Sequence, residues 1–316
     1  MANDQIQIFA GSSHQELAKE IAEHLGLPLS PMFISRFACG EIYAKPTETV
    51  RGNDVFVIQT CSPTVNEDLM ELFIILDSLK RSFAGRIHVV MPHYGYARQD
   101  RVATPREPIS AKLVADLISK AGADHIITMK LHSDQEQGFF NMPVDNLNTE
   151  KLFADYFKKK DLKDMVVVSP DAGGAKDAKR FADKIGADLA IIHKSRPEHN
   201  QSEVTHVVGD VKGRKCILYD DMIDTAGSVT AAKEALVKMG ADSEVYLAAT
   251  HAVFSGPAIE RFKAAKFKEV VVTNSIPLGP DKQFEGLTVL SVAPLLAKII
   301  QSVHQKKSVT HALNED

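Results

Sequence analysis

The sequence predicts an α/β protein with two similar domains, each a mainly parallel sheet flanked by helices. Short apolar or β-branched runs alternate with amphipathic stretches along nearly the whole chain, as in proteins built from parallel strands and helical crossovers. The pattern runs once to about residue 145 and begins again after the basic, turn-like residues 158–164. A length of 316 residues also favours two domains, because single hydrophobic cores stop growing near ~250–300 residues.

The expected strands are short runs of near-continuous apolar character, which is typical of strands buried on both faces of a sheet. They cover residues 6–10, 54–60, 86–91, 125–129, 165–169, 189–193, 215–219, 245–250, 270–273 and 287–292. The domains are expected to span residues 1–150 and 151–316.

Helices between these strands have recognisable ends. Ser13 and Glu16 are predicted to form a capping box for a helix that Gly26 closes. Other expected helix starts and ends are Ser110 and Gly122, Gly240 after residues 229–239, and Pro257 at the start of residues 257–267.

Composition excludes several classes of protein. A net charge of -4 gives no reason to expect nucleic acid as a partner. No apolar run approaches the ~18 residues of a membrane span, and the first residues lack a signal-peptide pattern. Three widely spaced cysteines, Cys39, Cys61 and Cys216, argue against a disulfide framework and a zinc cluster. We therefore expect a cytoplasmic protein.

The segment 217–236, ILYDDMIDTAGSVTAAKEAL, combines an anion-binding pattern with carboxylates. It is predicted to lead from the carboxyl end of a strand into a helix, where open α/β sheets bind ligands. The amides and hydroxyls of residues 225–228 can converge on phosphate oxygens at the helix N-terminus. Asp220 and Asp224 can accept hydrogen bonds from sugar hydroxyls. This combination predicts a phosphorylated pentose as ligand; the alternative is that Asp220, Asp221 and Asp224 are ordinary acids near a helix start.

Other nucleotide or hydrolase motifs are missing from the sequence. It contains no G-x-x-x-x-G-K-[ST], G-x-G-x-x-G, G-x-S-x-G or H-E-x-x-H pattern.

Residues 220–228 resemble the ribose 5-phosphate loop of the type I phosphoribosyltransferase fold, with Ser228 where Thr is more usual. The chain also resembles the ribose-phosphate diphosphokinase family from about residue 6 to beyond 300, in order and with family spacing. The segments that carry this resemblance are 37–60, 92–101, 106–118, 130–147, 169–183 and 193–196.

The resemblance implies a reaction in which Mg-ATP and ribose 5-phosphate give AMP and 5-phosphoribosyl 1-diphosphate. The anomeric hydroxyl attacks the β-phosphorus, so the protein supplies mainly positioning and charge neutralisation. Magnesium is then the cofactor. The resemblance also implies self-association into a hexamer built from dimers, with each ATP site shared between subunits.

Individual roles follow from the same resemblance. The N-terminal domain is expected to contribute ATP-binding residues, and the C-terminal domain the ribose 5-phosphate and catalytic loops. The ATP-binding residues are Cys39, Glu41, Arg98 and Gln99, and the metal-site residues are His132 and Asp171. Lys194 and Arg196 are catalytic, and the sugar phosphate is bound by Arg196, Asp220, Asp224, Thr225, Ala226, Gly227 and Ser228.

Three departures from the family pattern bear on function. Lys130 stands where many members have Asp, and Cys39 lies in a stretch that usually reads Phe-Ser-Asp/Asn-Gly-Glu. Asp134 replaces a Ser of phosphate-activated, ADP-inhibited members, and the tail 308–313 also differs from theirs. Because a carboxylate repels phosphate, we expect the usual phosphate activation to be reduced or absent.

Two other functions share part of this pattern. A phosphoribosyltransferase that consumes the diphosphate would share residues 220–228 but would not need Arg98 and Gln99. A non-enzymatic regulatory relative would lose the catalytic cations, whereas Lys194 and Arg196 are present; only Lys130 favours this alternative.

Overall fold

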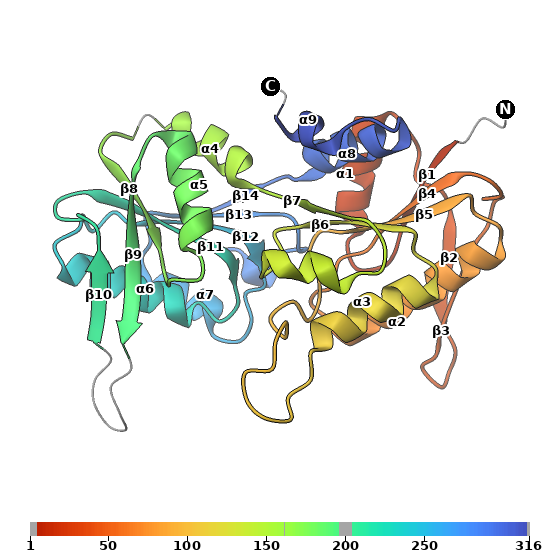
Figure 1. Ribbon diagram of the computed structural model, residues 1–316, viewed down its shortest axis with the longest axis horizontal. Coiled ribbons are helices and arrows are strands. Elements are labelled where there is room, and N and C mark those ends of the chain that lie inside the picture. The colour runs from red at the N-terminus through yellow and green to blue at the C-terminus, as the bar shows by residue number, and fades with distance from the viewer. Residues whose placement is uncertain (1–4, 161, 196–203, 315–316) are drawn as a thin grey trace. The chain divides into compact units, whose positions relative to one another are not determined.

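The chain forms two compact units in a computed structural model that describes residues 5–160, 162–195 and 204–314. Unit 1 comprises Met1–Leu147, Ser275–Pro277 and Ser291–Asp316, and unit 2 comprises Asn148–Asn274 and Leu278–Leu290. Figure 1 labels their helices and strands. The predicted class, α/β with mainly parallel sheets flanked by helices, is confirmed.

Unit 1 is built on a five-stranded parallel sheet of order β1-β4-β5-β6-β7. These strands are β1 (Ile6–Ala10), β4 (Asp54–Ile58), β5 (Arg86–Met91), β6 (His125–Met129) and β7 (Val144–Leu147). Its helices are α1 (Gln15–Leu25), α2 (Val65–Arg81), α3 (Ser110–Ala121), α8 (Ala293–His304), α9 (Val309–Asn314) and the 3-10 helix η1 (Asp134–Phe139). Figure 1 shows α2 and α3 on one side of this sheet and α1 with α8 on the other.

A separate hairpin, β2 (Met32–Arg36) with β3 (Ile42–Pro46), was not expected from the sequence. Its alternation is clear in β3, where Ile42 and Ala44 are buried and Tyr43 faces solvent. Two strands of five residues offer too short a pattern to distinguish from a loop.

Unit 2 carries a seven-stranded sheet of order β10-β9-β8-β11-β12-β13-β14, parallel except for the β9–β10 pair. The strands are β8 (Met165–Ser169), β9 (Asp188–Ser195), β10 (Val204–Val208), β11 (Lys215–Ile223), β12 (Tyr246–Ala252), β13 (Glu269–Thr273) and β14 (Leu287–Leu290). Its helices are α4 (Glu150–Lys158), α5 (Ala175–Ile185), α6 (Gly227–Lys238), α7 (Ala258–Ala265) and the 3-10 helix η2 (Pro280–Lys282).

The two faces of this sheet bury separate cores. Val168 and Leu218 pack with residues of α6 and α7, whereas their neighbours Val167 and Ile217 pack with residues of α4 and α5. Successive side chains of a strand point to opposite faces, so strands covered on both sides read as continuous apolar runs. This explains why the central strands were visible in the sequence.

The first helix begins differently from the expectation. The side chain of His14, not Ser13, caps α1, accepting a hydrogen bond from the Leu17 amide at 3.4 Å. The Ser13 hydroxyl instead donates to Oε1 of Gln59 at 2.7 Å and accepts from the amide of Thr60 at 3.0 Å. The predicted capping box is therefore wrong, because strand β4 and its extension compete for the same hydroxyl. The predicted helix end at Gly26 is confirmed.

The C-terminal residues return to unit 1. The hydroxyl of Ser291 donates to Glu20 of α1 at 2.5 Å, and Nδ1 of His304 lies 2.8 Å from Oδ2 of Asp54 in β4. The domain division at residue 150 stays a prediction. None of the described helices is long and apolar enough to cross a membrane.

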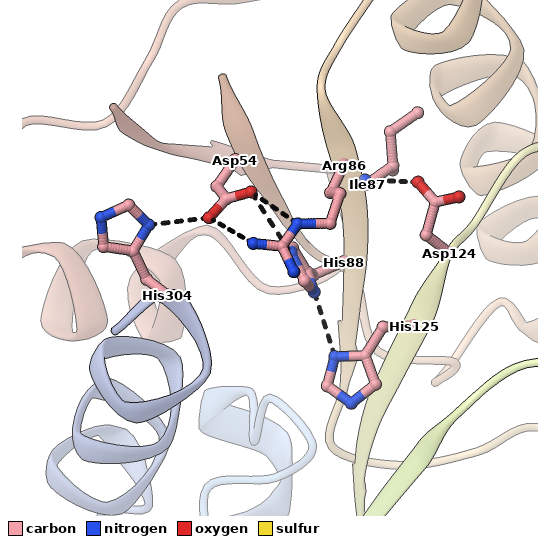
Figure 2. Close-up of polar contacts among 7 residues, drawn as sticks. All are labelled: Asp54, Arg86, Ile87, His88, Asp124, His125 and His304. Atoms are coloured by element: carbon pink, nitrogen blue, oxygen red, sulfur yellow. Dashed lines mark hydrogen bonds and ion pairs between the residues drawn. The ribbon is translucent and has the colours of Figure 1, made fainter. Parts of the chain in front are cut away.

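Asp54 is the centre of a buried polar cluster in unit 1 (Figure 2). Arg86 donates to both of its oxygens at 3.1 and 3.3 Å, and His304 bonds one of them. Although burial raises the pKa of Asp54, the bonds from His304 and Arg86 outweigh it and lower the pKa. The cluster thus fixes a carboxylate among cationic and imidazole donors and joins α8 to the sheet.

His88 and His125 form the other half of this cluster. Their Nδ1 atoms lie 3.0 Å apart, so only one of the two carries the shared proton. The ring of His88 stacks on Phe56 with 4.3 Å between centroids, and its Nε2 has no hydrogen-bond partner among the described residues. Burial, followed by the neighbouring His125, lowers the pKa of His88 to about 4.

We predict that His88 makes the protein less stable in acid. As the pH falls from 6.5 towards 4, the unfolded chain takes up a proton at this histidine before the folded chain does, so unfolding becomes easier. Between pH 7.5 and pH 5 this difference amounts to about 2 kcal/mol. His88→Asn retains an amide near the Nδ1 position but cannot titrate, so the loss should shrink by that amount.

Urea-induced unfolding at both pH values, followed by circular dichroism, measures this effect. His24→Asn, at an exposed position in the last turn of α1, is the matched control and should keep the wild-type pH dependence. If His88→Asn kept the wild-type pH dependence, His88 would not be the cause of the lower stability in acid.

Candidate active site

In unit 1, two loops meet at the carboxyl edge of the sheet. The strands β5 and β6 are parallel neighbours, so the loop after each lies at the same edge, and the amide of Met129 bonds the carbonyl of Pro92 at 3.2 Å. The first loop carries Arg98 and Gln99, both exposed. Oε1 of Gln99 accepts from the Ser110 hydroxyl at 2.6 Å, which orients its amide nitrogen as a donor.

The second loop carries Lys130 and His132. His132 is exposed, whereas Lys130 is 4% exposed with a positive φ of 42°. The amide of Lys130 bonds the carbonyl of Leu147 in β7 at 2.9 Å. The residue that departs from the family pattern is therefore packed inside unit 1, while His132 is at the surface.

Cys39 and Glu41 lie on the β2–β3 hairpin and not at the carboxyl edge of the five-stranded sheet. Both are exposed, in a turn closed by the Phe37 amide on the Glu41 carbonyl at 2.9 Å. Gly40 has a φ of 95°, which L side chains avoid. Phe37 is 56% exposed and packs edge-on against Tyr43.

In unit 2, the carboxyl ends of β8, β9 and β11 lie side by side because β8 is parallel to both neighbours. Asp171 follows β8 and is exposed; its Oδ1 accepts from the Gly174 amide at 3.0 Å. Lys194 lies near the end of β9, opposite Thr205 of β10. Arg196 lies outside the described residues.

Asp220 and Asp221 belong to a strand, not to the loop that the sequence suggested. The strand β11 continues through Ile223, with Asp220 paired to Ala249 of β12. The backbone amide of Asp221 donates to Oδ1 of Asp220 at 2.9 Å, so the two acids remain in contact. Burial raises the pKa of Asp220 well above its ordinary value, and the charges of Asp221 and Asp171 raise it further. Hydroxyl donors or a cation here would relieve that repulsion.

The loop between β11 and α6 is shaped for an anion. It comprises Asp224, Thr225 and Ala226, and Ala226 precedes the helix in the left-handed conformation with a φ of 60°. The helix begins at Gly227, and the first amides of a helix have no carbonyl partner within it. Small side chains in this loop and first turn let a phosphate approach those amides.

The carbonyls of the same loop are turned into the protein. Those of Ile223 and Asp224 accept from the amides of Phe254 and Ser255 at 3.1 and 2.9 Å. The carbonyl of Thr225 accepts from Nη1 of Arg261 at 2.8 Å, and that of Ala226 from the Thr230 hydroxyl at 2.9 Å. Each carbonyl therefore has a donor on unit 2.

Sequence reasoning missed Arg261. It lies in α7, far along the chain from the loop, and reads there as an exposed basic residue of an amphipathic helix. No spacing or motif indicates that its side chain returns to Thr225.

The two units thus carry different parts of the predicted site. Unit 1 has Cys39, Glu41, Arg98, Gln99 and His132, and unit 2 has Asp171, Lys194, Asp220, Asp224, Thr225, Ala226, Gly227 and Ser228. Within the described ranges, no group of three or more His, Cys, Asp or Glu side chains is arranged to hold a metal ion.

Family models match both parts of the chain. One described as the N-terminal domain of ribose phosphate pyrophosphokinase covers residues 6–122. Another, described as a phosphoribosyl synthetase-associated domain, covers residues 200–314.

Curated and solved relatives match nearly the whole length. A Bacillus caldolyticus protein named ribose-phosphate pyrophosphokinase is 53% identical over 97% of this chain and 97% of its own. One of the same name from Clostridium acetobutylicum is 50% identical over 98% of each chain. The crystal structure of phosphoribosylpyrophosphate synthetase from Mycobacterium smegmatis aligns with a TM-score of 0.91 and 47% identity, covering 96% of this chain and 100% of that one. The resemblance drawn from the sequence is confirmed.

We predict that Asp220→Asn stabilises the ligand-free protein. The change removes an ionisable group whose charged form is disfavoured by burial and by Asp221 and Asp171, while the amide oxygen can still accept from the Asp221 backbone amide. Relief of about 1 kcal/mol should raise the melting temperature by about 2–4 °C at pH 8. Differential scanning calorimetry measures it, with the exposed Asp155→Asn of α4 as control. A lower melting temperature for Asp220→Asn would show that its charge is not repelled.

Proposed function

Since the chain belongs to the ribose-phosphate pyrophosphokinase family, we propose that it transfers the diphosphoryl group of Mg-ATP to ribose 5-phosphate. The products are AMP and 5-phosphoribosyl 1-diphosphate, a precursor for nucleotide biosynthesis. The observation that carries this proposal is the loop 224–226 before α6, whose carbonyls are bonded into unit 2 while carboxylates lie on the strand before it.

The sugar phosphate binds at the carboxyl edge of the seven-stranded sheet. Its phosphate accepts hydrogen bonds from the amides of residues 225–228 and from the hydroxyls of Thr225 and Ser228. Asp220 and Asp224 accept from ring hydroxyls, which also relieves the raised pKa of Asp220. The carboxylates thus contact the sugar ring of the ligand, and the amides and hydroxyls contact its phosphate.

ATP binds through Arg98 and Gln99. The guanidinium of Arg98 suits the triphosphate, and the oriented amide of Gln99 suits a base edge. Cys39 and Glu41 on the exposed hairpin turn reach the adenine of a neighbouring subunit. This arrangement requires self-association, which we propose gives a hexamer built from dimers.

In the reaction, the anomeric oxygen forms a bond to the β-phosphorus and the bond from that phosphorus to the α,β-bridging oxygen breaks. The hydroxyl proton is lost to solvent or a nearby base, and AMP leaves with the bridging oxygen. Lys194 and Arg196 neutralise charge that develops on the transferring group. Lys194 belongs to β9.

Magnesium, when bound with ATP, neutralises the phosphate oxygens. A magnesium ion carried by a nucleotide takes only one or two protein ligands and fills its other positions with phosphates and water. His132 and Asp171, each exposed at a carboxyl edge, fit such single-ligand roles. Carboxylate repulsion around Asp220 also favours a cation nearby.

We predict that phosphorus NMR of the protein with ATP, Mg²⁺ and ribose 5-phosphate will show AMP together with a new sugar-linked diphosphate. Inorganic phosphate and ADP should not accumulate, because the diphosphoryl group moves in one piece. The control omits ribose 5-phosphate and should leave ATP unchanged. Unchanged ATP in the complete mixture with folded protein would contradict the proposed reaction.

Regulation by phosphate should be weak because of Asp134. This residue is exposed at the start of η1, next to a capping box in which the Ser133 amide donates to Glu136 at 2.7 Å. Its carboxylate adds a negative charge where phosphate-activated relatives have a hydroxyl.

We predict that Asp134→Ser strengthens activation by inorganic phosphate relative to the wild type. Removing the like charge should lower the phosphate concentration for half-maximal activation by at least about tenfold. Initial rates against inorganic phosphate at constant ionic strength measure it, with Asp155→Ser as the control for loss of a surface acid. Strong activation of the wild type would contradict the role given to Asp134.

A further inference from the structure

We propose that Arg261 is a positioning residue for the sugar phosphate: its guanidinium holds the peptide between Thr225 and Ala226 so that the Ala226 amide faces the phosphate. The inference rests on the proposed function and adds to it a residue that lies outside the loop. Arg261 belongs to α7, and its Nη1 donates to the Thr225 carbonyl at 2.8 Å.

The trans peptide between Thr225 and Ala226 fixes the direction of the Ala226 amide. In a trans peptide the carbonyl and the amide of the next residue point in opposite directions. Because Arg261 holds the carbonyl of Thr225 on its own side, the amide of Ala226 points to the other side. The neighbouring carbonyls of Asp224 and Ala226 are bonded by Ser255 and Thr230, so the loop is held along its length by donors from the protein.

The backbone of Ala226 is strained. Ala226 has a φ of 60° and a ψ of 4°, a left-handed conformation that costs a residue with a Cβ about 1–2 kcal/mol. Such a conformation persists only where the surroundings determine it. Without the bond from Arg261, the peptide can flip and Ala226 can relax, which turns its amide away from the ligand.

The guanidinium of Arg261 lies close to Gly227. A Cβ added to Gly227 would lie 3.1 Å from Nη1 of Arg261 and 3.7 Å from its Cζ. The guanidinium therefore packs directly against the first residue of α6. A side chain at position 227 would require the guanidinium to shift by a few tenths of an ångström.

The test measures binding of ribose 5-phosphate by calorimetry. Wild type is titrated first, and a wild type that binds no ribose 5-phosphate would refute the proposed sugar-phosphate site itself. Given wild-type binding, Arg261→Met should weaken it about tenfold, which corresponds to about 1.4 kcal/mol. In steady-state kinetics the same variant should raise the KM for ribose 5-phosphate while the KM for ATP stays within about twofold.

Lys263→Met is the matched control, because it removes another exposed cation from the same helix. It should bind ribose 5-phosphate within about twofold of wild type. Equal weakening in Lys263→Met would replace the positioning role with a general effect of charge. Wild-type binding in Arg261→Met would refute the inference outright.

A second-site change separates positioning from direct attraction of the phosphate. Glycine adopts a positive φ without a steric cost, so Ala226→Gly should recover part of the affinity lost in Arg261→Met when the two are combined. The double variant is compared with Ala226→Gly alone. Failure of Ala226→Gly to recover any affinity would assign Arg261 a purely electrostatic effect and overturn the positioning role.

Discussion

Parallel pairing of β11 between β8 and β12 is the constraint on which the candidate site of unit 2 depends. Because all three strands run in one direction, the segments that follow them emerge at one edge. Asp171 and the loop 224–228 are brought together in this way although more than fifty positions of sequence separate them. Helices cover both faces of β11, and burial is the first cause of the raised pKa of Asp220. The strand order therefore sets where Asp171, Asp220 and the segment 224–228 lie relative to one another.

The carboxylates and the anion-binding loop no longer conflict once the backbone is considered. Asp220 and Asp221 lie on the strand and Asp224 in the loop, whereas the proposed phosphate site uses amides from the loop and the first turn of α6. Amides are available there because the carbonyls of residues 223–226 are bonded on the other side. An anion-binding loop thus depends on donors that bond its carbonyls as much as on amides that face the anion.

Features that depend on local pattern are predictable from this sequence, and features that depend on tertiary contacts are not. The central strands were visible because they are buried on both faces. Ser13 was assigned to the wrong cap because Gln59, brought close only by folding, takes its hydroxyl. The end of β11 was placed too early, since Asp220 and Asp221 look like loop residues when the neighbouring strands are unknown. Arg261 had no local signal at all.

The return of the C-terminal segment to unit 1 has a consequence during synthesis of the chain. The bond of His304 to Asp54 and that of Ser291 to Glu20 join residues 250 and 271 positions apart. A ribosome must therefore release nearly the whole chain before the first unit can gain its last two helices. The unit formed first in sequence is among the last to be finished, and its uncovered face needs protection from aggregation in the meantime. A product truncated before residue 291 would expose that face permanently, which marks it for degradation rather than assembly.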